Sequence, residues 1–206
     1  MKAARIALAI ACGSLAVAGA DAKRRAAVIG QSDWRKAATD TDRDRLRRWR
    51  AAWIDVLAAA GTNGVAAMAA ADPSLFDPDR ALSGADLPAG GYRCRTTRFG
   101  IRMVAAQPAG TTAVPCTVTQ HGKIGALQID GQQRISGQLY DGGDARAVFL
   151  GAVGFGDERQ VMRYGRDASR DMAGLIERIG ERRWRLVLPY PHFGGTLDLV
   201  EIVPRD

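Results

Sequence analysis

The sequence predicts a mainly β protein of the α+β class, an antiparallel barrel of roughly eight strands preceded by a helical arm. Apolar residues recur at helical spacing over residues 39–60, and towards the C-terminus the apolar spacing changes towards two. Of the 24 glycines, 19 lie at or after Gly84, where turns must join the strands. Eight antiparallel strands joined by short turns can close into a barrel. An open β-sandwich is the alternative architecture.

The first 20 residues have the three-part layout of a secretory signal peptide. Lys2 and Arg5 precede an uncharged apolar run, and Ala18-Gly19-Ala20 is small where a signal peptidase reads. We expect cleavage near Ala20, with a site before Lys23 as second choice, and a periplasmic or secreted protein. The apolar run is too short to span a membrane, so we expect no stable membrane insertion after cleavage. A lipid anchor at Cys12 is the less favoured alternative.

Two cysteines, Cys94 and Cys116, remain after this cleavage. An even pair of thiols in an exported protein most simply forms a disulfide bond. Both cysteines fall on the more apolar side of segments that alternate like β-strands, so a bridge between two strands is geometrically reasonable. We therefore predict a structural disulfide.

The expected organisation is one folded domain in three parts, a helical arm over residues 21–72, a Pro/Gly linker over 73–91 and the barrel over 92–206. Within the arm, residues 39–60 form one helix, with Thr39 among the candidate N-caps and Gly61 at its C-terminal end. A shorter helix is expected over residues 65–71.

Short alternating segments and turn sequences place the strands. Asp141-Gly142-Gly143-Asp144 and Gly180-Glu181 are both typical of hairpin turns. The expected strands, the third, sixth and last of them weaker, occupy residues 92–97, 114–119, 124–129, 135–139, 145–153, 160–164, 173–179, 182–188 and 196–203.

A search for catalytic motifs yields no GxSxG, SxxK, HExxH or P-loop sequence, and the two histidines stand apart in expected loops. We therefore expect no metal and no cofactor. The densest polar segment begins near residue 157, and its acids and arginines could bind a polar or anionic ligand at the barrel mouth. They could equally be paired in structural salt bridges. The candidate ligand-binding residues are Arg159, Tyr164, Arg166, Asp167, Arg170, Asp171 and Glu177.

The formal net charge of +7 does not indicate nucleic-acid binding. Of the 29 basic residues, 25 are arginines spread among acids, and few aromatic side chains lie near them. Two of the charges also leave with the signal peptide.

Several motifs resemble one uncharacterised bacterial family, catalogued only as a domain of unknown function, family number 4893. They include Tyr92-Arg93-Cys94-Arg95, Tyr164-Gly165-Arg166-Asp167 and Glu177-Arg178-Ile179-Gly180. The segment Arg183-Trp184-Arg185-Leu186-Val187-Leu188-Pro189-Tyr190-Pro191 is similar to it too. The resemblance covers roughly residues 34–204 and implies an exported single-domain protein with no known activity.

Three functions fit these observations. The first is a monomeric, non-enzymatic barrel that binds a small ligand or an envelope component, and an interior packed solid with side chains would rule it out. The second is an inhibitor or interaction protein of the cell envelope, with residues 189–195 as the contacting loop. The least favoured is a hydrolase that uses Asp171 and Glu177 as its carboxylate pair.

Overall fold

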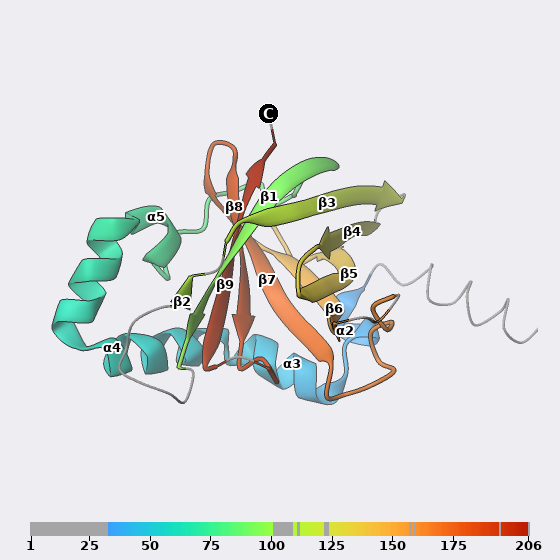
Figure 1. The fold of residues 1–206 in the computed structure, drawn as a ribbon, viewed down its shortest axis with the longest axis horizontal. Coiled ribbons are helices and arrows are strands. Elements are labelled where there is room, and N and C mark those ends of the chain that lie inside the picture. Colours follow the sequence, from blue (N-terminus) through green and yellow to red (C-terminus); the bar gives the residue numbers. More distant parts are fainter. Residues whose placement is uncertain are drawn as a thin grey trace, which may run out of the picture. The chain divides into compact units, whose positions relative to one another are not determined.

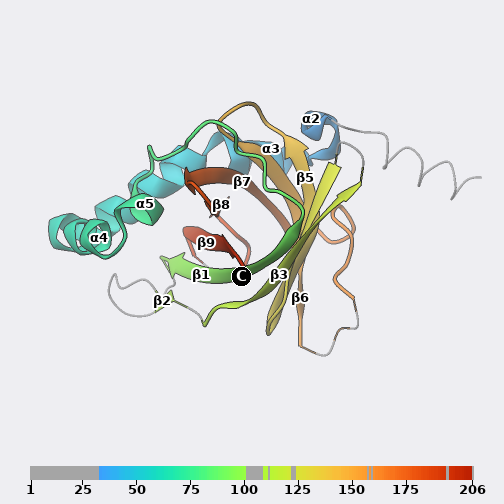
Figure 2. The same cartoon turned by 90° about the horizontal axis from the view of Figure 1, so that it is seen from above.

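Eight antiparallel strands form a closed barrel (Figures 1 and 2). The structure is a computed structural model that describes residues 33–100, 109–110, 112–121, 124–156, 158, 160–193 and 195–205. Each strand pairs with the next, and β1 pairs with β9 over eight residue pairs, which closes the ring. The predicted barrel is therefore confirmed. The strands are β1 (Gly90–Phe99), β3 (Val114–His121), β4 (Ile124–Ile129), β5 (Gln133–Asp141), β6 (Ala147–Phe155), β7 (Asp171–Gly180), β8 (Arg183–Pro189) and β9 (Leu197–Pro204), with a two-residue strand β2 (Ala109–Gly110) beside β1.

Both predicted hairpin turns are present. In the first, Asp141 pairs with Ala147 across the β5–β6 turn, and the second joins β7 to β8. The strand expected over residues 160–164 is wrong, because β6 pairs directly with β7 and leaves no place between them. Residues 160–164 instead belong to the β6–β7 connection, where Tyr164 binds the helical layer.

The helical layer consists of α2 (Trp34–Ala37), α3 (Asp40–Arg47), α4 (Trp49–Ala71) and α5 (Pro73–Phe76). Thr39 caps α3 by accepting a hydrogen bond from the Asp42 backbone N–H. The single helix expected over residues 39–60 is wrong, because the chain breaks at Arg48, whose guanidinium lies over the Tyr190 ring. Gly61 has a φ of 64°, as expected of a residue that ends a helix, but the chain becomes helical again at once.

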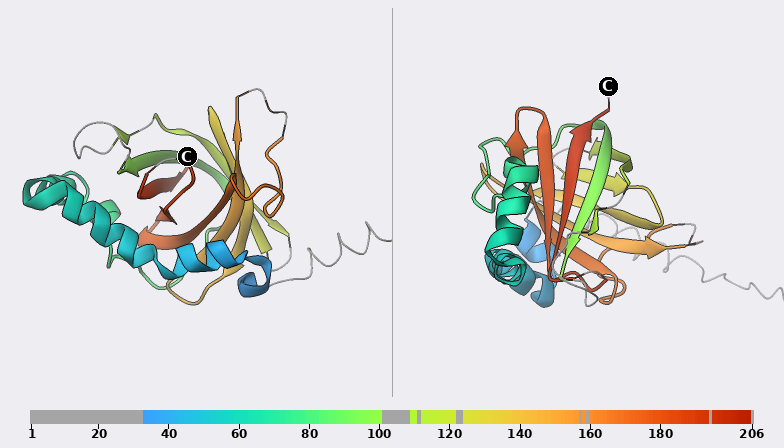
Figure 3. Two further views of the ribbon diagram at one scale, coloured as in Figure 1. Left: turned by 90° about the horizontal axis from the view of Figure 1, so that it is seen from below. Right: turned by 60° about the vertical axis from the view of Figure 1, so that its left-hand side comes forward.

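Two apolar cores meet at the barrel wall. One fills the interior with residues from all eight barrel strands, including Leu127, Phe149 and Ile202. The other lies between the helices and the outer faces of strands β6 to β9, where Trp53 is 1% exposed (Figure 3). Strands β6, β7 and β8 are therefore buried on both faces, and this explains their nearly continuous burial.

The interior is packed so closely that two strands approach through glycine. A Cβ on Gly137 of β5 would lie 2.5 Å from both Gly151 Cα on β6 and the Phe149 ring. The two glycines give this ring its place inside the barrel. Apolar side chains of the described residues therefore fill the middle of the space that eight strands can enclose.

Helix α4 has an unusual exposed surface. By length and composition alone it could span a membrane, and only 11% of its most apolar window is buried. Its Ile54 side chain is among the most exposed large apolar groups that the structure describes.

The predicted disulfide joins Cys94 on β1 to Cys116 on β3 inside the barrel, across two strands that share five residue pairs. The bridge closes a loop with a sequence separation of 22. A cross-link of this length stabilises the fold by about 3 kcal/mol, because it restricts the unfolded chain.

We predict that replacing both Cys94 and Cys116 by serine lowers the free energy of unfolding by about 3 kcal/mol in urea titrations. Reductant should have the same effect on the parent protein and none on the double variant. If reductant leaves the parent curve unchanged, the disulfide does not contribute to stability.

Candidate functional site

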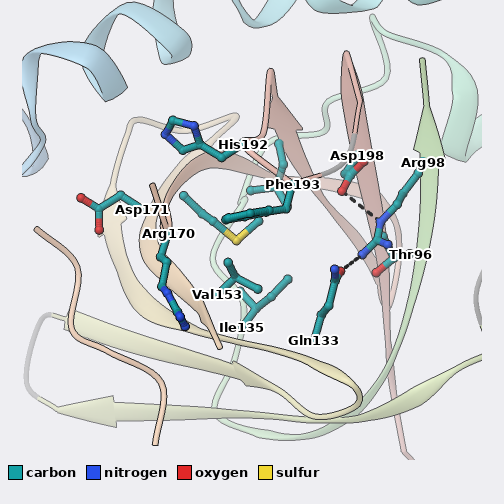
Figure 4. A pocket seen from close by; sticks show the side chains of 12 residues that line it. Thr96, Arg98, Gln133, Ile135, Val153, Arg170, Asp171, His192, Phe193 and Asp198 are labelled. Atoms are coloured by element: carbon teal, nitrogen blue, oxygen red, sulfur yellow. Dashed lines mark hydrogen bonds and ion pairs between the residues drawn. The ribbon is translucent and has the colours of Figure 1, made fainter. Parts of the chain in front are cut away.

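Four polar side chains point into one end of the barrel (Figure 4). Apolar side chains would be expected at these inward-facing positions. Thr96 and Arg98 come from β1, Gln133 begins β5, and Asp198 lies near the start of β9. Arg98 and Asp198 are in phase with the inward-facing Cys94 and Val200, respectively. Because strands alternate their faces, this register turns both charged side chains inward.

Asp198 is the most deeply buried member of this cluster, at 2% exposure. Its Oδ2 atom accepts a hydrogen bond from Arg98 Nε at 3.3 Å, and Arg98 also donates from Nη2 to Oε1 of Gln133. Its Oδ1 atom is buried without a hydrogen-bond partner among the described residues. Burial raises the pKa of Asp198 to about 6, although the Arg98 guanidinium opposes this shift.

A small cavity separates this cluster from the end of the barrel. Its volume is about 10 Å³, enough for a group the size of one water molecule. Arg170, His192 and Phe193 form the solvent-facing side of its lining, and Phe193 is 43% exposed. Figure 4 shows Phe193 between Asp198 on one side and Arg170 on the other.

The loop between β8 and β9, which carries His192 and Phe193, is fastened to the helices. The Arg45 Nη2 atom lies 2.5 Å from His192 Nε2, and Tyr190 donates from its hydroxyl to Asp55 at 2.7 Å. Because a guanidinium only donates, His192 Nε2 is the acceptor. Tyr190 has a φ of 47°, a conformation that non-glycine residues rarely adopt. Tyr190 and His192 thus anchor this loop to the helices at the end of the barrel.

Tyr164 and Asp171 belong to a polar network against α3. The Tyr164 hydroxyl donates to Asp42 Oδ2 at 2.5 Å and accepts from the Thr39 backbone N–H. Burial, followed by the hydrogen bond to Asp42, raises the Tyr164 pKa. Asp171 accepts from the Gly165 N–H at 2.9 Å, and burial raises its pKa. Figure 4 shows the Asp171 carboxylate turned away from the cavity.

Arg170 and Asp167, near the cavity, each have their own polar partner. Arg170 donates to Glu158, and this hydrogen bond lowers the pKa of the Glu158 carboxyl. Asp167 accepts from both the hydroxyl and the N–H of Ser169, which lowers its pKa. Arg166 is exposed, and Arg159 lies outside the described residues.

Glu177 is held in a structural ion pair. It is fully buried, and its two oxygens accept from Arg146 Nε at 2.7 Å and from Arg185 Nε at 2.8 Å. Arg185, also fully buried, donates to the carbonyls of Leu75 and Asp77, at the end of α5, and lies over the Trp53 ring. This arrangement is the alternative that the sequence left open, a paired salt bridge.

The structure therefore divides the predicted ligand-binding residues. Arg170 and Asp171 line the cavity, and Tyr164 adjoins Asp171 through the connection between β6 and β7. Asp171 and Glu177 share the outer face of β7, but six residues separate them, or about 20 Å along a strand. That separation is far greater than glycosidic acid–base chemistry allows.

Sequence reasoning missed the inward-facing polar residues. Asp198 is in phase with Val200 and Ile202 in an expected strand, and this register was the available signal. Nothing local connects it with Arg98, which is a hundred residues away. Within the described part of the chain, no group of three or more His, Cys, Asp or Glu residues could hold a metal ion.

These features define a closed eight-stranded antiparallel barrel with an outer helical layer and a small polar cavity at one end. The sequence family described as "Domain of unknown function (DUF4893)" matches residues 34–202, so the chain belongs to that family, as the sequence motifs predicted. Searches among curated proteins and solved structures found no match.

We predict that Glu177→Gln lowers the free energy of unfolding by about 3–5 kcal/mol, because it leaves the buried Arg185 charge without its counter-ion. Urea unfolding monitored by tryptophan fluorescence measures the loss. Arg47→Gln removes the exposed partner of Asp44 and should cost less than about 1 kcal/mol. Equal losses in the two variants would contradict the central role of the buried pair.

We predict that Asp198→Asn makes the protein more stable relative to the parent as the pH rises. The parent's folded-state pKa of about 6 lies above the ordinary aspartate pKa of 3.8, so the folded protein holds the proton up to a higher pH. Its stability is therefore highest while Asp198 is protonated and falls as the pH rises through this window. Asn keeps the acceptor for Arg98 without this penalty.

The difference in unfolding free energy between variant and parent should grow by about 2 kcal/mol from about pH 4 to about pH 7. Thermal and urea unfolding across this range measure it. A constant difference would mean that Asp198 does not titrate there in the folded protein.

Proposed function

We propose that this protein is an exported, non-enzymatic binding protein that holds a small ligand or an envelope component at the polar end of its barrel. The buried Oδ1 atom of Asp198, which has no hydrogen-bond partner among the described residues, carries the proposal. A buried acceptor without a donor costs about 1–3 kcal/mol, and a ligand with a donor group would satisfy it. Because the apolar core fills the middle of the barrel, the small cavity at its end supports a ligand there rather than in a central chamber.

Export of the protein is part of the proposal. The signal-like first 20 residues and the Cys94–Cys116 disulfide both support an oxidising compartment, the periplasm or the cell exterior.

The non-enzymatic part of the proposal is supported by the chemistry near the cavity. The two carboxylates suggested for hydrolysis are far apart, and Glu177 is occupied by two arginines. Asp198, Arg98 and Gln133 form a set that can recognise a polar group by hydrogen bonding.

We predict that the full chain, exported and purified from periplasm, retains a ligand visible as added mass in native mass spectrometry and lost under denaturing conditions. Asp198→Ala should reduce the ligand-bound fraction about tenfold, because it removes a buried hydrogen-bonding partner. Asp144→Ala, which removes an exposed carboxylate from the β5–β6 turn, is the matched control and should keep the ligand.

A second variant, Phe193→Ala, tests the same cavity from its exposed side and protects the experiment against misfolding of Asp198→Ala. Retention of the same added mass by both variants, or bare protein in every case, would refute the proposed binding site.

A second candidate function is an envelope interaction protein or inhibitor, and the exposed apolar surface of α4 favours it. Exposed apolar surface of this kind commonly marks an interaction site. Of residues 189–195, expected to form the contacting loop, Tyr190 and His192 are instead bound to the helices at the barrel end. Inhibition of a purified envelope hydrolase, weakened by Ile54→Asp, would support this function, and no effect on a panel of such hydrolases would oppose it.

A further inference from the structure

The charges around the cavity are balanced before any ligand arrives. Arg98 faces Asp198 inside the barrel, and Arg170 is paired with Glu158 at its edge. A cationic ligand would approach two arginines, and an anionic ligand would approach the Asp198 carboxylate. Because binding sites complement the charge of their ligands, this balance favours a neutral ligand.

The cavity also selects the size and polarity of the group that enters it. A space of about 10 Å³ holds one water-sized group, so only the hydroxyl group of a ligand can enter it. The orphan Asp198 Oδ1 accepts a hydrogen bond, and hydroxyl groups donate one. A neutral donor of this size is a hydroxyl.

An aromatic surface stands beside the opening. The Phe193 ring is 43% exposed and is supported by an edge-to-face contact with Phe155, their centroids 4.9 Å apart. Arg170 lies over the Phe155 ring and adds a further contact to this pair. A supported, exposed aromatic side chain offers an apolar platform to one face of a ring-shaped ligand.

We propose that the ligand is a neutral, hydroxyl-bearing ring such as a sugar, which lies against Phe193 and directs one hydroxymethyl group towards Asp198. This inference rests on the proposed binding function and names the chemistry of its ligand. The hydroxyl donates to Asp198 Oδ1, and its oxygen accepts from the amide or guanidinium groups of the same cluster (Figure 4).

A series of four sugars that differ at a single carbon tests the inference. D-Glucose carries the neutral hydroxymethyl arm, D-glucuronate a carboxylate, 6-amino-6-deoxy-D-glucose an ammonium group, and D-xylose no arm at all. Backbone amide shifts in NMR titrations of the oxidised protein report both affinity and location. We expect saturable shifts with glucose, centred on Phe193 and the start of β9, and at least about tenfold weaker binding of the other three.

Variants identify the contacts. Phe193→Ala should weaken glucose binding about tenfold, whereas Met162→Ala, which truncates another exposed apolar side chain, should leave it unchanged. Asp198→Ala should abolish the discrimination between glucose and xylose, since the arm would have lost its acceptor.

Tighter binding of the charged sugars, equal binding of xylose, or no saturable shift with glucose would overturn the inference. If a retained ligand is nevertheless seen by native mass spectrometry and is lost in Asp198→Ala, the binding function stands and only the ligand class is wrong. If neither measurement detects binding, both proposals fail.

Discussion

The position of the helical layer depends on one buried guanidinium, that of Arg185. It pairs with Glu177 within the barrel wall and donates to backbone carbonyls of Leu75, Asp77 and Arg80. Its face lies over the Trp53 ring of α4. A buried charge is tolerated only when hydrogen bonds and a counter-ion surround it, so the chain around α5 must follow this one side chain. A shift of the helices would break the hydrogen bonds and the ring contact of Arg185.

The position of the helical layer that Arg185 sets also affects the cavity, because the same helices contact the loop beside it. Once α4 is fixed, α3 lies against β7, and Arg45 on α3 contacts both the Asp171 carbonyl and His192. Tyr190 is held in turn by Asp55 of α4. The loop that bears Phe193 is therefore positioned from outside the barrel, while the polar cluster beneath it is positioned from inside. The cavity exists because two independently packed layers meet at this end.

Local sequence patterns predicted much of the fold but did not predict the residues of the site. Gly142-Gly143 and Gly61 act through their own backbone, so sequence reasoning found the hairpin and the helix break. The break at Arg48, whose guanidinium lies over the distant Tyr190 ring, gave no local sign. Glu177 looked like a ligand-binding residue because its partner, Arg185, stands on the neighbouring strand, and pairing across strands follows only from the register.

The described part of the barrel contains two kinds of buried polar group, those whose hydrogen bonds are all satisfied and those with an unpaired oxygen. We assign Arg185 and Glu177, of the first kind, to structure and Asp198, of the second, to function. Arg185 and Glu177 are completely surrounded by partners, and their desolvation is offset by the contacts that orient α5. Asp198 is also buried, yet its Oδ1 atom lacks a hydrogen-bond partner among the described residues, and burial raises its pKa to about 6. An apolar residue at this inward position would continue the packing of Val200 and Ile202 without that penalty. The unpaired Asp198 acceptor lowers the stability of the fold, and a hydrogen-bond donor that enters the cavity would recover this free energy. This is the physical basis for assigning the site to binding.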